Sequence, residues 1–459
     1  MNLRDAMPQK FRQLELPLEG RGESLDVERS AESSLATDGN ARPGASSGLM
    51  ELVCERENMK AAMKRVRSNK GSPGIDGMTV EELPVYLREH WPRHREDLLA
   101  GRYQPSAVKR VAIPKHGGGE RELGIPTVLD RLIQQACLQV LQPSFDASFS
   151  DHSYGFRPGR KAHDAVCRAQ RYVQEGRRWV VDIDLEKFFD RVNHDVLMGR
   201  LAKRIEDRRM LRLIRGYLNA GVLADGVVLE RHEGTPQGGP LSPMLANVLL
   251  DEVDKELEKR GHAFVRYADD LNVYVRSQRA GERVMESMRR LYANLKLRVN
   301  ESKSAVAPAT QRKFLGFSFW IRFRDDSVKR TVASQSLERL KERVRELTRR
   351  NIGRSMTQVC KRLGAYLVGW KGYFHFAETR TVLHDIDKWI RHRLRALQLK
   401  HWKHAHVIQR ELVKRGMSWG RAKSVSVNVG RWWMNSAIAL HIALPNQHFD
   451  QLGIPRLAA

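Results

Sequence analysis

Two adjacent acids, Asp269 and Asp270, lie in the middle of the stretch FVRYADDLNVYV, residues 264–275. Apolar residues alternate along the chain on both sides of them, which predicts two half-buried strands joined by a tight turn. Carboxylates in an apolar hairpin are costly unless something positive compensates them. Because hard carboxylate oxygens that also face substrate phosphates suit Mg²⁺, we expect this turn to hold a divalent metal ion.

A third carboxylate comes from the stretch WVVDIDL, residues 179–185, which predicts a buried strand. Asp182 and Asp184 lie two residues apart in it and therefore point to the same face. With Asp269 and Asp270, one of them would complete a site for two Mg²⁺ ions, which activate an attacking 3′-hydroxyl and stabilise the leaving pyrophosphate. A role in a turn or a helix cap would explain any one of these acids equally well. That alternative weakens when the acids are considered together.

The charge of the chain points to a polyanionic partner. Its 459 residues include 80 Lys and Arg against 54 Asp and Glu, a net charge of +26, while the apolar content of 41% is ordinary. Such a surplus is typical of proteins that bind nucleic acid or an acidic membrane surface.

No apolar run approaches the roughly 20 residues of a membrane span. The charged beginning MNLRDAMPQKFRQ is not a secretory signal, and the four cysteines form no CxxC pair, so we expect neither a zinc ribbon nor a disulfide framework in a soluble intracellular protein.

The positive charge is concentrated in residues 328–431, which hold 25 Lys and Arg against 7 Asp and Glu, a net of +18. Aromatic residues are interleaved with these charges, namely Trp370, Tyr373, Trp389, Trp402 and Trp419. A solvated helical surface would explain a shorter run of charge. Over about a hundred residues, the mixture of cations and aromatic rings favours phosphate contacts combined with base stacking.

The elements that must position these residues divide into three groups. Residues 1–48 are rich in Gly, Ser, Glu and Ala and predict a disordered leader. From Leu52 to about residue 325, helical patterns alternate with strands, including a hairpin over 110–126 with a glycine tip and a strand region over 313–323. From about Ser334 the pattern becomes helical. The sequence therefore predicts an α+β fold.

Three motifs resemble those of reverse transcriptases. YADD, residues 267–270, is similar to their metal-binding hairpin, and GTPQGGPLSPMLAN, residues 234–247, to their QGxxxSP motif. DLEKFFD, residues 184–190, resembles their first palm motif, in which an Asp precedes an aromatic residue by five positions. That spacing selects Asp184, because Phe189 is five residues on, and leaves Asp182 a structural role.

Further motifs narrow the resemblance to group II intron-encoded reverse transcriptases, or maturases, of the short bacterial type that lacks an endonuclease domain. They are NKGSPGIDG at 69–77, IPKHGGGERELGIPTVLDRLIQQA at 113–136, SYGFRPGRKAHDA at 153–165, FLGF at 314–317 and GWKGYF at 369–374. The resemblance covers about residues 50–459. It implies a right-hand polymerase with helical fingers, an antiparallel palm sheet and a helical thumb or maturase (X) domain.

The domains expected from this resemblance are a leader over 1–48, fingers and palm over 49–325, the thumb or maturase domain over 326–440 and a tail over 441–459. The implied function is an RNA-directed DNA polymerase that binds its group II intron RNA, assists its splicing and copies it into DNA during retrohoming. The implied partners are intron RNA, target DNA, a primer–template and dNTPs, with two Mg²⁺ ions as cofactors and no membrane. Such a protein would be cytoplasmic in a bacterium.

The resemblance also assigns roles near the incoming nucleotide. Asp184, Asp269 and Asp270 would bind the metal ions and catalyse the transfer. Gln237 would lie near the nucleotide, and Gly238 would let the backbone approach it closely.

Other roles concern the sugar and the phosphates of the nucleotide. The ring of Phe189 would exclude a ribose 2′-hydroxyl. Lys115 and Arg121 flank the glycine tip and would clamp the triphosphate, the arginine bidentately, although an ordinary exposed hairpin is the alternative. Lys303, in NESKS, matches the position of a lysine proposed as general acid to the pyrophosphate, and a surface lysine explains it equally well.

Two assignments concern the primer and the intron RNA. Leu315 and Gly316 of FLGF would belong to the primer grip. In the basic segment, Arg391, Arg393 and Arg395 form a cluster expected to bind RNA, although residues two apart on a helix fan out around its axis.

Three competing hypotheses remain open. An RNA-dependent RNA polymerase shares the palm chemistry, but members of that group resemble one another in carrying an acid where this chain has Phe189. A splicing cofactor with a decayed polymerase would be favoured by the loss of an acid, whereas all three are present. A polymerase recruited to host defence or repair is not distinguished by these motifs.

Overall fold

The structure is a computed structural model that describes residues 48–114, 120–224, 227–229, 233–236, 238–349, 353–428, 430–438 and 440–458. The described chain divides into two compact units, 48–312 and 313–458, which we treat separately. The division falls at Lys313, whereas the sequence placed it at residue 326. The predicted leader lies almost wholly outside the described residues.

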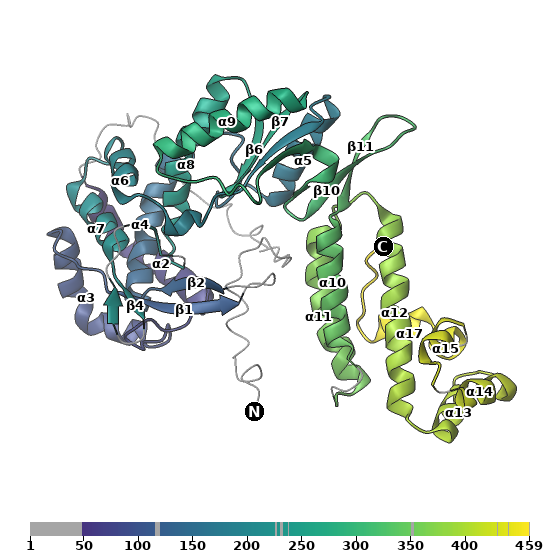
Figure 1. The fold of residues 1–459 in the computed structure, drawn as a ribbon. Helices are drawn as coiled ribbons and strands as arrows, with labels where there is room; N and C mark the ends of the chain where they lie inside the picture. Colours follow the sequence, from purple (N-terminus) through teal and green to yellow (C-terminus); the bar gives the residue numbers. More distant parts are fainter. Residues whose placement is uncertain are drawn as a thin grey trace, which may run out of the picture. The chain divides into compact units, whose positions relative to one another are not determined.

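The first unit, which we call the polymerase unit after the function that the resemblance predicts, mixes helices and strands (Figure 1). Its helices are α1 (Leu49–Val53), α2 (Arg56–Ser68), α3 (Leu83–Leu99), α4 (Val128–Asp146), α5 (Ala162–Gln174), α6 (His194–Ala202), α7 (Arg208–Asn219), α8 (Ser242–Lys259) and α9 (Gln278–Asn294). Its strands are β1 (Val108–Pro114), β2 (Glu120–Ile125), β3 (Trp179–Ile183), β4 (Val222–Ala224), β5 (Val227–Leu229), β6 (Ala263–Tyr267), β7 (Asp270–Val275) and β8 (Ala305–Pro308).

The predicted antiparallel palm sheet is present, with strand order β6-β7-β3-β8 and every pairing antiparallel. Helix α9 packs on β3, β7 and β8, and α5 packs on β6 (Figure 1). Strands β6 and β7 are almost wholly buried because helices cover the sheet, whereas the alternating pattern predicted half-buried strands. Val181 and Val273 pair across the centre of the sheet and are completely buried.

The hairpin predicted over 110–126 is also present, as β1 and β2 paired antiparallel from Lys109 and Ile125 to Pro114 and Glu120. Its glycine tip lies outside the described residues. Strand β4 adds to β1 in parallel and β5 extends the sheet, which therefore has the order β2-β1-β4-β5.

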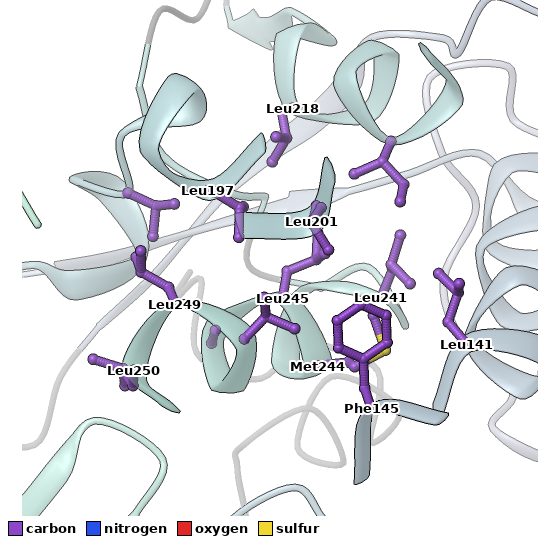
Figure 2. Packing of buried hydrophobic residues seen from close by; sticks show 14 of the residues in the cluster. Leu141, Phe145, Leu197, Leu201, Leu218, Leu241, Met244, Leu245, Leu249 and Leu250 are labelled. Carbon is purple, nitrogen blue, oxygen red and sulfur yellow. The ribbon is translucent and has the colours of Figure 1, made fainter. Parts of the chain in front are cut away.

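Some helices of this unit start at side-chain caps, and the helices close over a common apolar core. Thr127 caps α4 and Asn193 caps α6, each by accepting a hydrogen bond from a backbone amide three residues on. Figure 2 shows Leu197 of α6 beside Leu249 of α8 in the core that these helices share. The core fixes the two helices that flank the predicted motifs at 184–190 and 234–247.

The second unit, here called the helical unit, begins with a short sheet and continues as helices. The strands are β9 (Lys313–Phe314), β10 (Phe317–Ile321) and β11 (Val328–Val332), in the order β11-β10-β9. The helices are α10 (Ser334–Leu347), α11 (Met356–Phe374), α12 (Arg380–Trp402), α13 (Ala405–Lys414), α14 (Trp419–Val427), α15 (Trp432–Ile438), α16 (Leu440–Ala443) and α17 (Asn446–Gln451). The α+β class and the change to helices near residue 334 are confirmed.

The segment predicted as a tail, 441–459, packs into the helical unit. Phe449, Ile454 and Leu457 are buried there, and a Cβ at Gly364 of α11 would lie 2.3 Å from the Gly453 carbonyl oxygen. None of the helices that the structure describes combines the length and the apolar character needed to cross a lipid bilayer.

Candidate active site

The predicted acidic hairpin is formed by β6 and β7, which are joined by the two-residue turn Ala268–Asp269. Tyr267 pairs with Asp270 across the turn. Ala268 has a φ of +57°, a left-handed conformation that is unfavourable for a residue with a Cβ. Asp269 and Asp270 therefore lie at a tight turn whose backbone the surrounding structure must hold in place.

Contacts from Gly155 and Arg266 hold this turn in place. Gly155 packs against it so closely that an added Cβ would lie 2.3 Å from the Ala268 nitrogen, which leaves room only for glycine. Arg266 donates hydrogen bonds to the Ala268 carbonyl (2.9 Å) and to Asn247 Oδ1 (2.8 Å). Asn247 in turn donates to the Gly155 carbonyl at 2.9 Å. The network links the SYGF motif, α8 and the acidic turn.

Arg266 is completely buried and forms an ion pair with Asp254 of α8, which is also fully buried, at 2.5 Å. Burial lowers the pKa of Arg266, but the attraction of Asp254 outweighs it, so the net shift is upward and the guanidinium stays charged. A charge that deep in the protein is tolerated because the carboxylate of Asp254 and two further oxygen acceptors surround it. The ion pair anchors the acidic turn to α8.

Asp184 follows β3 directly, beside the acidic turn. Ile183 pairs with Leu271 of β7, and Asp182 pairs with Asn272, so the chain continues from Ile183 toward the position opposite Asp270. The Asp184 side chain is 44% exposed. The structure thus brings the ends of the two predicted acidic segments to the same edge of the palm sheet.

Asp182 lies in β3 itself and has a different environment from Asp184. Its carboxylate forms an ion pair with Arg312 at 2.5 Å and is mostly buried. The carboxylate is therefore already occupied by a guanidinium, in agreement with the structural role expected for Asp182.

The carboxylates at this edge fit Mg²⁺ as hard oxygen donors. Within the described residues, no three acidic, histidine or cysteine side chains form a complete metal cage. The three predicted carboxylates are thus not gathered into one ligand set, and their binding of Mg²⁺, which often uses one or two carboxylates together with substrate phosphates, stays a prediction. The ammonium of Lys303 lies 3.7 Å from Asp184 Oδ1, so a positive charge is already beside this carboxylate.

Phe189 lies in a short 3₁₀ helix, Phe188–Asp190, with its ring partly exposed and edge-on to Phe188. The Thr235 amide donates to the Phe189 carbonyl at 2.7 Å, which ties the start of the QGxxxSP motif to this residue. His194 Nε2 donates to the Gly234 carbonyl (2.7 Å), and its ring is buried, so this histidine has a structural role.

The structure describes only part of the predicted nucleotide site. Lys115 and Gln237 lie outside the described residues. The backbone of Arg121 pairs with Ile113, but its side chain is not described. Gly238 has a φ of +137°, and an added Cβ would lie 2.7 Å from the Gly124 carbonyl oxygen, so both its conformation and its packing require glycine.

The predicted primer-grip residues form a turn rather than a continuous strand. Phe314 pairs with Phe317, so Leu315 and Gly316 are the two turn residues, with φ of +51° and +81°. Tyr373, in the GWKGYF motif on α11, donates its hydroxyl to the Leu315 carbonyl at 2.8 Å. The FLGF and GWKGYF motifs are therefore one structural assembly within the helical unit.

The interpretation of Arg391 and Arg395 as RNA contacts is wrong, because both side chains are buried. Arg391 donates to Asp387 (3.3 Å) and to Asp450 (2.7 Å). Arg395 donates to the Leu444 carbonyl at 2.8 Å and to an asparagine. Burial and the neighbouring Arg391 lower the pKa of Arg395 to about 10. Both arginines hold the C-terminal segment against α12.

Arg393 of the same cluster points elsewhere on α12. It is half-buried, donates to Thr348 at 2.9 Å and lies over the Trp389 ring. The three residues do not form one surface.

Sequence reasoning missed the residues that support the acidic turn, namely Arg266, Asp254 and Asn247. Arg266 carried a signal, since it is the one charged residue in the otherwise apolar stretch AFVRY. Its partner Asp254 belongs to α8, and nothing in the sequence pairs the two.

Comparison with known proteins agrees with this architecture. Residues 113–319 match the model of the reverse transcriptase (RNA-dependent DNA polymerase) family, and residues 337–416 match that of the group II intron maturase-specific domain. Protein YkfC of Escherichia coli K12 is 33% identical over 299 residues, which cover 56% of this chain and 78% of YkfC.

Two further relatives are named for introns. The group II intron-encoded protein LtrA of Lactococcus lactis is 37% identical over 195 residues, or 42% of this chain and 32% of LtrA. A putative COX1/OXI3 intron 2 protein of Saccharomyces cerevisiae is 30% identical over 216 residues, or 46% of this chain and 25% of that protein. The alignments thus span a third or less of these two relatives.

The palm sheet, with its carboxylates at one edge, and the matched polymerase domain define an RNA-directed DNA polymerase. The maturase-specific domain that follows specifies the family further. The chain belongs to the group II intron-encoded reverse transcriptases and maturases.

Proposed function

We propose that this chain copies RNA into DNA at the edge of the palm sheet where Asp184 meets the Asp269–Asp270 turn, and that its helical unit binds the group II intron RNA whose splicing it assists. The observation that carries the catalytic part is the register of β3 on β7, which brings these acidic segments together from distant parts of the sequence. The maturase-specific domain over 337–416 supports the RNA part.

Asp184, Asp269 and Asp270 would hold two Mg²⁺ ions together with the phosphates of the incoming dNTP. When bound, the metal ions lower the pKa of the primer 3′-hydroxyl and neutralise the charge that develops on the phosphates. In the transfer, the 3′-hydroxyl loses its proton to solvent, its oxygen bonds to the α-phosphorus, and the bond from that phosphorus to the pyrophosphate oxygen breaks.

The chain's other residues would orient the reactants. Phe189 borders the sugar of the nucleotide and excludes a 2′-hydroxyl. Gly238 lets the backbone approach the nucleotide, with Gln237 beside it. Lys303 places a positive charge next to Asp184, where it would meet the leaving pyrophosphate and protonate it.

The remaining assignments concern the partners. Lys115 and Arg121 would contact the triphosphate from the β1–β2 hairpin, and the turn of Leu315 and Gly316 would contact the primer. Intron RNA, a primer–template and target DNA would be the nucleic-acid partners of this strongly basic chain in the bacterial cytoplasm, with retrohoming as the outcome.

The catalytic assignment is tested by Asp184→Asn and Asp269→Asn, measured by primer extension on an RNA template with saturating Mg²⁺. Each substitution removes one metal-binding charge, so we expect a loss of rate of roughly 10²- to 10³-fold or more, as for other removals of transition-state stabilisation. Asp195→Asn is the control, since Asp195 is an exposed acid on α6 paired with Arg215. A near wild-type rate in either site variant, in protein that melts normally, would refute the assignment.

A further inference from the structure

The turn that carries Lys303 is attached to the backbone of Asp184 and of the two residues that follow it. Leu185 forms an antiparallel bridge with Val299, and the Asn300 amide donates to the Asp184 carbonyl at 2.8 Å. The Glu186 amide donates to the Arg298 carbonyl at 2.9 Å. Residues 298–304, here called the lysine turn, therefore add a short extra strand pairing beyond the end of β3.

Ser304 closes the lysine turn onto Asp184. Its hydroxyl accepts a hydrogen bond from the Asp184 amide at 3.0 Å and donates one to the Asp184 carbonyl at 3.3 Å. One side chain thus satisfies both backbone groups of a residue 120 positions away. Backbone groups that are partly buried must be paired in this way, so the contact fixes the turn relative to Asp184.

Arg312 supplies a second, independent attachment. Its guanidinium donates Nε to Asp182 Oδ2 at 2.8 Å and Nη2 to the carbonyl of Lys303 itself at 2.7 Å. The planar guanidinium can bridge two acceptors in a fixed geometry, and bonds to a carboxylate are among the stronger ones in proteins. Arg312 therefore links the central strand of the palm sheet to the backbone of Lys303.

These attachments matter because the lysine side chain cannot hold its own position. Lys303 is 66% exposed, and its ion pair with Asp184 spans 3.7 Å. An exposed ion pair contributes little, since water screens it and two long side chains must be ordered. The position of the ammonium beside Asp184 therefore depends on the backbone of the lysine turn.

We propose that Ser304, Arg312 and Asp182 are positioning residues for nucleotidyl transfer, which act by holding the backbone of Lys303 so that its ammonium stays beside Asp184 and the leaving phosphates. The inference rests on the proposed function and assigns a role to three residues outside the metal-binding set. Asp182 acts by holding the guanidinium of Arg312 and not by binding a metal ion.

The test is a double-mutant cycle on the rate of single-nucleotide incorporation, with Arg312→Gln, Ser304→Ala and Lys303→Ala alone and in pairs. Misplacement of a reacting group by about 1 Å can cost up to about a hundredfold in rate. We expect Arg312→Gln and Ser304→Ala each to lower the maximal incorporation rate about tenfold, with the apparent Kd of dNTP changed less than about twofold. In the Lys303→Ala background, each should lower the rate by less than about twofold, because the group that they position is gone.

Three controls separate positioning from loss of structure. Ser302→Ala removes a hydroxyl from the same turn that bonds only Asn300 among the described contacts, and should leave the rate unchanged. Arg102→Gln removes a guanidinium paired with Glu96 and Asp97 at the end of α3. Ser304→Thr keeps the hydroxyl and should restore the rate that Ser304→Ala loses.

The proposal would be overturned if Arg312→Gln and Ser304→Ala lowered the incorporation rate by the same factor in the Lys303→Ala background as in the wild type, because these variants would then act independently of the lysine. Full activity of Lys303→Ala or of Arg312→Gln would overturn it as well. Full activity of Lys303→Ala would also remove the role of Lys303 in the proposed function, but none of these results would affect the assignment of the metal-binding acids, which the Asp184→Asn and Asp269→Asn variants test by themselves.

Discussion

At the scale of single residues, Phe189 combines a fixed backbone with a partly exposed ring. Its carbonyl accepts a hydrogen bond from the Thr235 amide. Gly234, which precedes Thr235, packs so tightly that an added Cβ would lie 2.9 Å from the Asp190 carbonyl oxygen. The ring cannot move away from a bulky neighbour by shifting the backbone. A side chain held in this way is suited to discriminate by size.

We therefore predict that Phe189→Ala admits ribonucleotides. The ratio of NTP to dNTP incorporation should rise roughly tenfold or more, in the range by which pockets discriminate ligands of different bulk. Incorporation assays with each nucleotide alone measure the ratio. Phe188→Leu is the control, because Phe188 is buried beside it. An unchanged ratio would mean that Phe189 only packs against the core.

Arg391 gives a second prediction at this scale. Arg391→Gln leaves Asp387 and Asp450 without their buried cation, so it should destabilise the helical unit by about 3–5 kcal/mol. Hydrogen exchange of the α12 and α17 amides measures this unit separately from the polymerase unit. Lys361→Gln, at an exposed cation of α11, should change exchange little. A loss of RNA affinity in Arg391→Gln with normal exchange would restore the RNA-contact interpretation.

At the scale of elements, the β6–β7 hairpin depends on the ion pair between Arg266 and Asp254. We predict that Asp254→Asn costs about 3–5 kcal/mol of stability in the polymerase unit, because it leaves a buried guanidinium without its counter-charge. Hydrogen exchange of the β6 and β7 amides measures this loss of stability. Glu256→Gln breaks only the more exposed contact with Arg260 on the same helix and should cost less than about 1 kcal/mol. Equal effects of the two variants would contradict the role of the buried pair.

The elements themselves were largely predictable, since local patterns encode them. The β6–β7 hairpin, the β1–β2 hairpin and the strand over 179–183 follow from alternation and apolar runs. The turn at Leu315 and Gly316 was not predicted. A leucine with positive φ has no local signature, and the Tyr373 hydroxyl that holds its carbonyl comes from a helix far along the chain.

The same limit explains the error at Arg391 and Arg395. A cation on a helix looks identical in sequence whether it faces RNA or a buried carboxylate. The partners Asp450 and Leu444 lie beyond the end of α12 and could be identified only after the C-terminal segment was seen packed on it. Asp184 and Asp269 are singled out by local motifs, and their catalytic role stays a prediction.

At the scale of the whole molecule, the net charge of +26 predicts RNA binding that weakens steeply with salt. Because Arg391 and Arg395 are internal, exposed cations must supply the contacts. We predict that Lys361→Glu combined with Arg362→Glu, both exposed on α11, lowers the affinity for intron RNA and reduces the slope of log affinity against log salt by about 2, one for each lost phosphate contact.

Binding titrations between 50 and 200 mM salt, the range in which such contacts are resolved, measure this slope. Glu338→Gln on α10 serves as a control for folding and handling, since it removes an exposed charge of the opposite sign. A slope that does not change in the double variant would place the RNA on another face of the protein.

The pairing of the palm sheet also has a consequence for how the chain folds. Strand β3 lies inside the palm sheet, yet both of its neighbours, β7 and β8, follow it far along the chain. Its pairing with them is non-local, and such pairings slow folding because a long loop must close first. During synthesis, β3 would leave the ribosome as an apolar segment whose two edges stay unpaired until residues 270–308 have been synthesised. We infer that the nascent polymerase unit is most vulnerable to aggregation in this interval, and that chaperone dependence would concentrate there.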